Sequence, residues 1–288
     1  MEKLEHLITR AESLISKLEL LLPAQAPAID WQAKAWRWIK HHGQATLQAV
    51  NHPHSIALDN IQFVDRQKAE IVRNTQQFLQ NLPANHVLLT GARGTGKSSL
   101  IKALLSAFST QGLRLIEVEK HDLVDLPEIV GLIRNRPEKF IIYCDDLTFE
   151  ANDTSYKALK VILDGSLEHA SSNVLVYATS NRKNLMPEFI ADNLPNKDFS
   201  GEIRPSDTIE EKTALAERFG LWLSFYSFDQ EEYLAIASHW LSTFNLTFDD
   251  VARQSALSFS HARGARSGRV AYQFAKDYAG KRLLNTKS

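Results

Sequence analysis

The feature that most constrains the fold of this chain is a glycine-rich octapeptide that follows a short apolar run. The octapeptide reads Gly91-Ala92-Arg93-Gly94-Thr95-Gly96-Lys97-Ser98 and fits the phosphate-loop pattern GxxxxGK[ST]. It follows Val87-Leu88-Leu89, and behind it apolar residues recur at helical spacing as far as Gly112. The sequence therefore predicts a strand, a loop and a helix in succession, which is the context that the motif requires.

Each part of the octapeptide suits the binding of a phosphorylated ligand. Its glycines allow consecutive main-chain N–H groups to turn toward phosphate oxygens, and the start of the following helix adds the positive end of a dipole. Lys97 can reach the β- and γ-phosphates, and the Ser98 hydroxyl can bind Mg²⁺. The predicted nucleotide-binding residues of the loop are Gly91, Ala92, Arg93, Gly94, Thr95, Gly96, Lys97, Ser98 and Ser99.

An acidic site is expected downstream, because the metal ion at a phosphate loop needs a carboxylate as well as a hydroxyl. Residues 140–144 form an apolar run that is followed directly by Asp145 and Asp146. We expect Asp145 to hold the hydration shell of Mg²⁺. We expect Asp146 to orient or deprotonate the water that attacks the γ-phosphate.

Short β-rich runs alternate with helical segments from about residue 58 onward. The strand candidates are residues 86–90, 113–118, 140–144, 173–179 and 221–228. Such alternation predicts an α/β fold whose parallel sheet is covered on both faces. The polar connection over residues 182–212 is expected to be a loop.

After the last strand candidate the pattern becomes helical. Asp229 and Glu232 have the spacing of a capping box, which predicts a helix from about residue 230 to 244. Thr247 and Asp250 repeat that spacing before the next helix. A third helix is expected after Ser267, so the C-terminal part should form a small helical domain.

The N-terminal part is also predicted to be helical. Apolar residues at spacings of three and four make residues 1–22 an amphipathic helix, which packs on its own domain or pairs as a coiled coil. A helix over residues 30–50 would place Trp31 and Trp38 on one face and Trp36 off it. These tryptophans serve core packing, partner docking or base stacking.

Composition narrows the classes of protein further. The 288 residues carry 33 Lys and Arg against 34 Asp and Glu, which argues against nucleic-acid binding by bulk charge. Residues 261–288 are an exception, with seven basic residues and one acid, and suit a nucleotide lid, a nucleic-acid face or a solvated tail. A single cysteine, Cys144, allows no intrachain disulfide.

The sequence shows no secretory signal, and no apolar run approaches the roughly 20 residues that a membrane helix needs. We therefore expect a cytoplasmic protein with no membrane partner.

Together these motifs make the chain similar to the AAA+ ATPases. Residues 174–180, followed by Asn181, resemble the sensor-1 strand of that class, which lies between the strands of the Walker A loop and the Walker B motif. The resemblance implies a five-stranded parallel sheet of order 5-1-4-3-2.

It also implies that Asn181 contacts the γ-phosphate or the attacking water. The alternative is that Asn181 is only a turn residue at the strand end. Many AAA+ proteins carry glutamate where this chain has Asp146, so slow hydrolysis or another base stays open, with Glu150 as the stand-in.

An arginine finger is the next element that the resemblance implies. Ala216-Glu217-Arg218-Phe219-Gly220 resembles the AAA+ segment that carries it, as in replication initiators. Arg218 would then project from one subunit into the ATP site of its neighbour, where a guanidinium stabilises charge in the transition state. A surface arginine paired with Glu210 or Glu211 is the alternative.

Three further positions complete the site that the resemblance implies. Arg269, with Arg266 as the reserve, resembles sensor 2 at the start of the third C-terminal helix. A basic helix start that binds nothing is the alternative. Phe63 and Val64 resemble residues that border the adenine in AAA+ proteins.

The similarity is closer still to a bacterial AAA+ group, the domain-of-unknown-function 815 family, over about residues 58–280. We expect an N-terminal helical region (1–57), an α/β nucleotide-binding core (58–228) and a C-terminal helical lid (229–288). The resemblance implies a homo-oligomer, such as a hexamer, that hydrolyses Mg-ATP between subunits and remodels or loads a protein or nucleic-acid client. The alternative is a slow-hydrolysing, ATP-gated binding module that docks a protein or nucleic acid through its N-terminal helices.

Overall fold

The computed structural model describes residues 28–41, 44–53, 55–148, 155–164, 172–181, 196–197, 203–204 and 215–285, with isolated helical positions at 5, 6, 8, 10 and 12. Three predictions lie outside these residues: the amphipathic helix over 1–22 apart from those positions, the acid at Glu150, and most of the connection over 182–212. Within the described residues, no helix is both long and apolar enough to cross a membrane.

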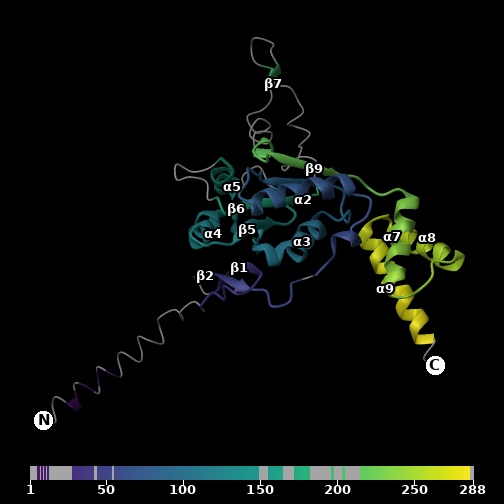
Figure 1. The fold of residues 1–288 in the computed structure, drawn as a ribbon, viewed down its shortest axis with the longest axis horizontal. Coiled ribbons are helices and arrows are strands. Elements are labelled where there is room, and N and C mark those ends of the chain that lie inside the picture. The colour runs from purple at the N-terminus through teal and green to yellow at the C-terminus, as the bar shows by residue number, and fades with distance from the viewer. Residues whose placement is uncertain are drawn as a thin grey trace.

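A seven-stranded sheet forms the centre of the molecule (Figure 1). Its strands are β1 (Ala35–His41), β2 (Gln44–Ala49), β3 (Val87–Gly91), β4 (Leu113–Glu117), β5 (Lys139–Cys144), β6 (Val174–Ser180) and β9 (Leu221–Phe225). Their order is β2-β1-β4-β5-β6-β3-β9, and all neighbours are parallel except β1 and β2. The short strands β7 (Asn196–Lys197) and β8 (Ile203–Arg204) form a separate antiparallel pair.

The prediction of a five-stranded sheet is wrong, because the sheet has two more strands, β1 and β2, beside β4. The five predicted strands, β3, β4, β5, β6 and β9, lie next to one another in the predicted order 5-1-4-3-2. The extra strands come from the segment over 30–50, where the predicted helix is also wrong, because β1 and β2 form an antiparallel hairpin. Trp36 and Trp38 explain the difference. Two residues apart on a strand, they share one face and are both buried, whereas a helix would point them in different directions.

The tryptophans of the hairpin hydrogen-bond to residues outside the strands. The indole N–H of Trp36 donates to Asp30 O at 3.0 Å, and that of Trp38 donates to Asp125 Oδ2 at 2.8 Å. Lys40 adds an ion pair to the Asp125 carboxylate at 2.7 Å. Because β1 pairs in parallel with β4, the hairpin covers an edge that would otherwise expose its main-chain hydrogen-bonding groups.

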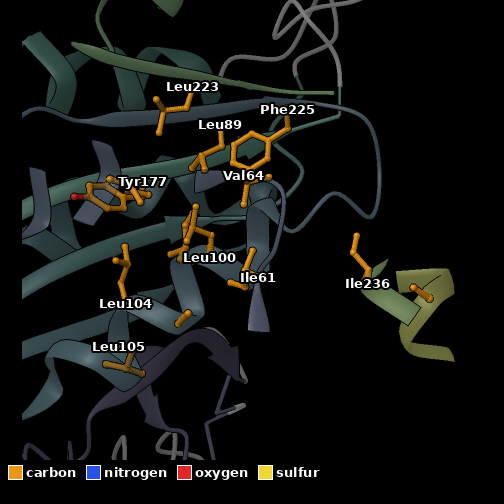
Figure 2. Packing of buried hydrophobic residues seen from close by; sticks show 14 of the residues in the cluster. Ile61, Val64, Leu89, Leu100, Leu104, Leu105, Tyr177, Leu223, Phe225 and Ile236 are labelled. Atoms are coloured by element: carbon orange, nitrogen blue, oxygen red, sulfur yellow. The ribbon is translucent and has the colours of Figure 1, made fainter. Parts of the chain in front are cut away.

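Helices cover both faces of the sheet, as the alternating pattern predicts. They are α2 (Asp65–Leu79), α3 (Lys97–Phe108), α4 (Leu126–Ile133) and α5 (Ser155–Asp164), with 3₁₀ turns η1 (Leu58–Asn60), η2 (Ser109–Gln111) and η3 (Lys120–Asp125). Side chains of α2 and α3 pack on one face and those of α4 and α5 on the other. Figure 2 shows Leu89 and Tyr177 of the sheet facing Leu100 and Leu104 of α3.

The C-terminal helices form a group beside the sheet (Figure 1). They are α7 (Gln230–Thr243), α8 (Asp250–Arg263) and α9 (Gly268–Asn285), which we call the lid. The capping box of Asp229 and Glu232 is confirmed at α7. The predicted capping box of Thr247 and Asp250 is wrong, because Asp249 caps α8 and accepts from Ala252 N–H at 2.8 Å.

A partly buried histidine is expected to make the fold sensitive to acid. His86 Nδ1 accepts from the Val176 N–H at 2.9 Å, and burial lowers the pKa of His86 from 6.5 to about 4. A protonated Nδ1 would present a second donor to that N–H. The unfolded chain therefore binds the proton more tightly, and the stability contributed by neutral His86 is lost as pH falls from about 6.5 to 4.

We expect this loss to reach about 2–3 kcal/mol at pH 4, in addition to the general acid sensitivity of the carboxylates. Urea unfolding of the parent and of His86→Asn between pH 7 and 4 measures it, because asparagine offers an acceptor oxygen that does not titrate in this range. Parallel stability curves for the two proteins would contradict the assignment to His86.

Candidate functional site

The glycine-rich loop joins β3 to α3 as the motif predicts. β3 ends at Gly91 and α3 begins at Lys97. Gly91, Gly94 and Gly96 all have positive φ, at +125°, +75° and +102°, where a side chain is strained. A Cβ on Gly91 would also lie 1.9 Å from the Phe225 carbonyl oxygen of the neighbouring strand, so the loop leaves the sheet in a space that only glycine fits.

Replacing Gly91 with alanine is expected to lower the free energy of unfolding by about 3 kcal/mol, through backbone strain and the contact with β9. Gly112→Ala is the matched control. Gly112 has φ +93° but nothing within 4 Å of an added Cβ, so we expect about 1–2 kcal/mol there. Denaturant unfolding measures both, and equal losses would contradict the role assigned to the contact with Phe225.

Lys97 lies at the centre of a group of converging polar contacts. Its side chain is buried, and Nζ donates to the carbonyl oxygens of Gly91 and Ala92 at 2.7 Å each and to Asn181 Oδ1 at 3.1 Å. Burial lowers the pKa of Lys97 from 10.5 to about 8, although the carboxylates of Asp145 and Asp146 oppose that shift.

The Walker B-like acid meets the first turn of α3. Asp145 Oδ1 accepts from Ser98 Oγ at 2.7 Å and from Thr179 Oγ1 at 2.6 Å. Burial would raise the pKa of Asp145, but the hydrogen bonds from Thr179 and Ser98 outweigh it and leave the pKa lowered. A carboxylate beside a hydroxyl is the hard oxygen set that Mg²⁺ prefers, so these two residues fit the expected metal ion.

Asp146 and Asn181 face each other across the ends of β5 and β6. Asn181 Nδ2 donates to Asp146 Oδ1 at 2.7 Å, so the Asn181 amide joins Asp146 to Lys97. Asp146 has φ +51°, which is unusual for a residue with a side chain. Arg93 of the loop lies on the outer side, with Nη2 4.0 Å from Asp146 Oδ2.

The lid touches the loop through the start of α9. The Arg269 N–H donates to the Gly94 carbonyl oxygen at 3.4 Å, and a Cβ on Gly94 would lie 2.7 Å from Ser267 Oγ. The charge of Arg269 also acts on Lys97, where it contributes to the lowered pKa. The structure therefore brings Arg269 to the loop, while Arg266 lies in the exposed turn between α8 and α9.

The two residues expected at the adenine differ in exposure. Val64 is buried in the core, whereas Phe63 has φ +59° and is 43% exposed. The Phe63 ring lies 6.4 Å from that of Phe228, edge to face, where the core joins the lid. Phe228 is also 3.7 Å from the place of a Cβ on Gly268, so Phe63 and Phe228 form an aromatic pair beside the glycine-rich loop and the start of α9.

Arg218 lies with α5 and not with the cluster around Lys97. Its Nε is 2.5 Å from Asp164 Oδ1 at the end of α5. The partners expected for a surface arginine, Glu210 and Glu211, lie outside the described residues. The pairing with Asp164 is a contact that no sequence pattern indicated, since the two residues are 54 positions apart.

These contacts define a class of protein by its fold. In a mostly parallel sheet, β6, the strand that ends before Asn181, lies between β5 and β3, and the C-terminal helices contact the glycine-rich loop. This arrangement is similar to the AAA+ fold. Solved structures agree: the FIGL-1 AAA domain in complex with ADP has a TM-score of 0.51 and 16% identity, covering 79% of this chain and 73% of that one. The replication initiator DnaA bound to AMPPCP and single-stranded DNA has a TM-score of 0.50 and 18% identity, covering 76% and 63%.

A mutant of RuvB from Thermotoga maritima is also similar, with a TM-score of 0.49, 15% identity and coverage of 81% and 67%. The chain thus spans about two thirds of the RuvB and DnaA chains it matches. It belongs to the family described as "Protein of unknown function (DUF815)", which it matches over residues 31–282. The matched range includes the hairpin of β1 and β2. No curated relative matches the sequence.

Proposed function

We propose that this chain is a Mg²⁺-dependent ATPase that binds ATP between its α/β core and its lid. The observation that carries the proposal is the convergence of Lys97, the Ser98–Asp145 pair, the Asn181–Asp146 pair and Arg269 on one glycine-rich loop. The FIGL-1 and DnaA structures hold ADP and AMPPCP on the same fold, which supports an adenine nucleotide as the ligand.

The chain's own residues account for phosphate binding. The Lys97 ammonium is held by two main-chain carbonyl oxygens, and it would exchange them for phosphate oxygens of opposite charge. The loop adds main-chain N–H groups and the N-terminus of α3. The exposed ring of Phe63, which packs on the buried Phe228, offers an aromatic surface for the base, and Arg269 adds a cation from the lid.

The two acids would have different roles in hydrolysis. Ser98 and Asp145 would hold Mg²⁺, which neutralises charge on the β- and γ-phosphates when bound. Asp146 would orient the attacking water and accept its proton. Asn181, which contacts both that acid and Lys97, would contact the γ-phosphate or the water.

The remaining elements of the proposal concern assembly. Arg218 is proposed to complete the site of a neighbouring subunit in a homo-oligomer such as a hexamer, in place of its ion pair with Asp164. The division into an N-terminal region (1–57), a core (58–228) and a lid (229–288) remains a prediction. A protein or nucleic-acid client would be remodelled or loaded as the lid follows the nucleotide state.

One observation favours a second function, a slow ATP-gated binding module. Asp146 has a short side chain, and its Oδ1 already accepts from Asn181 at 2.7 Å. If Asp146 keeps its hydrogen bond from Asn181, it is a poor base and the enzyme would hydrolyse ATP slowly. Bound ATP would then control the docking of a protein or nucleic-acid partner through the N-terminal region, without repeated cycles of hydrolysis.

Calorimetry with ATP, ADP and GTP, each with and without Mg²⁺, tests the shared basis of both functions. We expect Mg²⁺-dependent binding of adenine nucleotides, and no measurable affinity for them would refute the proposal. Steady-state phosphate release, alone and with DNA, RNA or lysate, then separates the two functions. Turnover at background in every condition, together with tight binding, would favour the binding module.

A further inference from the structure

Thr179 joins the two acids of the site through a single hydroxyl. It lies on β6, two residues before Asn181, and is 2% exposed. Its Oγ1 donates to Asp145 Oδ1 at 2.6 Å and accepts from the Asp146 N–H at 3.0 Å. Its carbonyl oxygen accepts from the Leu147 N–H at 2.6 Å. Thr179 therefore contacts all three residues that follow β5.

The direction of these hydrogen bonds follows from the donors available. A main-chain N–H can only donate, so the Thr179 oxygen must accept the bond from Asp146. The one hydroxyl proton of Thr179 is then directed to Asp145, which as a carboxylate can only accept. The same Asp145 oxygen accepts from Ser98, so Thr179 and Ser98 together set the orientation of that carboxylate.

The backbone beyond β5 also depends on this contact. Regular pairing of β5 with β6 ends at Cys144 and Ala178. Asp146 then adopts φ +51°, a conformation that costs a residue with a side chain about 1 kcal/mol or more and persists only where its surroundings hold it. The hydroxyl and carbonyl of Thr179 bond the N–H groups of Asp146 and Leu147 in place of the sheet ladder.

We propose that Thr179 is a positioning residue that sets Asp145 for the metal ion and Asp146 for the attacking water through its side-chain hydroxyl. It acts through these acids and does not itself touch the nucleotide. The inference rests on the proposed ATPase function, because it assigns Thr179 a role within that site. A hydrogen-bonding residue one step behind a metal ligand commonly changes metal affinity or activity by 10–100-fold.

Thr179→Val and Thr179→Ser separate the hydroxyl from packing. Valine keeps the branched shape and strand preference of threonine but has no hydroxyl, whereas serine keeps the hydroxyl. The readout is binding of a fluorescent ATP analogue over a Mg²⁺ titration and in EDTA. For Thr179→Val we expect a midpoint at least about 10-fold higher in Mg²⁺ and unchanged affinity in EDTA, with Thr179→Ser within about 3-fold of the parent.

Thr75→Val is the matched control for losing a buried hydroxyl. Thr75 Oγ1 bonds the Ile71 carbonyl and the Tyr177 hydroxyl on the α2 side of the sheet, so its loss should lower the melting temperature without moving the Mg²⁺ midpoint. Should Thr179→Val not fold, Thr179→Ala takes its place in the same titration, with the same expected shift.

The outcomes distinguish a failure of the proposed ATPase function from a failure of the role proposed for Thr179. No nucleotide binding by the parent would end the ATPase proposal itself. If the parent binds nucleotide with Mg²⁺ but Thr179→Val keeps the parental midpoint and only melts earlier, Thr179 is structural and the inference is overturned. Equal shifts for Val and Ser would overturn it as well, because they would assign the effect to packing and not to the hydroxyl.

Discussion

Replacing Lys97 with alanine is expected to weaken ATP binding at least about 100-fold. The change removes a buried ammonium that would form charge-assisted hydrogen bonds to phosphate, each worth about 1.5–3 kcal/mol. The loop would also lose the donor that now holds the carbonyl oxygens of Gly91 and Ala92. Calorimetry of the variant and the parent with Mg-ATP measures the difference.

Lys139→Ala is the matched control for this variant. Lys139 is also a buried lysine whose Nζ donates to a carbonyl oxygen, that of Ser172 at 2.7 Å. It lies at the start of β5, however, whereas Asp145 follows the end of that strand. We expect Lys139→Ala to lower stability while ATP affinity stays within about 3-fold of the parent. If Lys97→Ala bound ATP as the parent does, the phosphate site at this loop would be refuted.

The glycine-rich loop and its acids were predictable because they depend on local sequence. A strand that ends at Gly91 and a helix that begins at Lys97 follow from the glycines, the apolar run and the helical stripe. The carboxyl ends of parallel strands meet at one edge of a sheet, so Asp146 and Asn181 come together once the strands are recognised.

The hairpin at the far edge was missed because two periodicities compete in the same residues. Trp31 and Trp38 fit a helical repeat, while Trp36 and Trp38 fit a strand repeat of two. The strand prevails because β4 offers an edge to pair with and both indole N–H groups find acceptors, at Asp30 and Asp125. Neither partner is visible in the sequence of the hairpin itself.

Two side-chain contacts at the site and one outside it could not be predicted from the sequence. Thr179 reads as an ordinary strand residue, and its bond to Asp145 depends on the register between β5 and β6. Phe228 pairs with Phe63 only because the lid begins where the last strand ends. Arg218, which precedes β9, pairs with Asp164 at the end of α5, and no local pattern covers the 54 positions between them.

Replacing Arg218 with alanine is expected to leave ATP binding within about 3-fold of the parent and to lower the rate of hydrolysis by about 10³-fold. The reason is that Arg218 lies outside the contacts around Lys97 in its own chain, yet a guanidinium from a neighbour would stabilise charge in the transition state. Asp164→Asn is the control, because it removes the same ion pair without removing the guanidinium. Equal loss of hydrolysis in both variants would assign Arg218 a structural role.

Mixing two inactive variants tests whether the arginine acts between subunits. Lys97→Ala subunits keep Arg218, and Arg218→Ala subunits keep the glycine-rich loop, so one can complete the site of the other. In a head-to-tail ring assembled at random from equal amounts, half of the subunits keep the loop and half of those have a neighbour with Arg218. Phosphate release should therefore recover to about a quarter of the parental rate after mixing, whereas an arginine that acts within its own chain would give no recovery at any ratio.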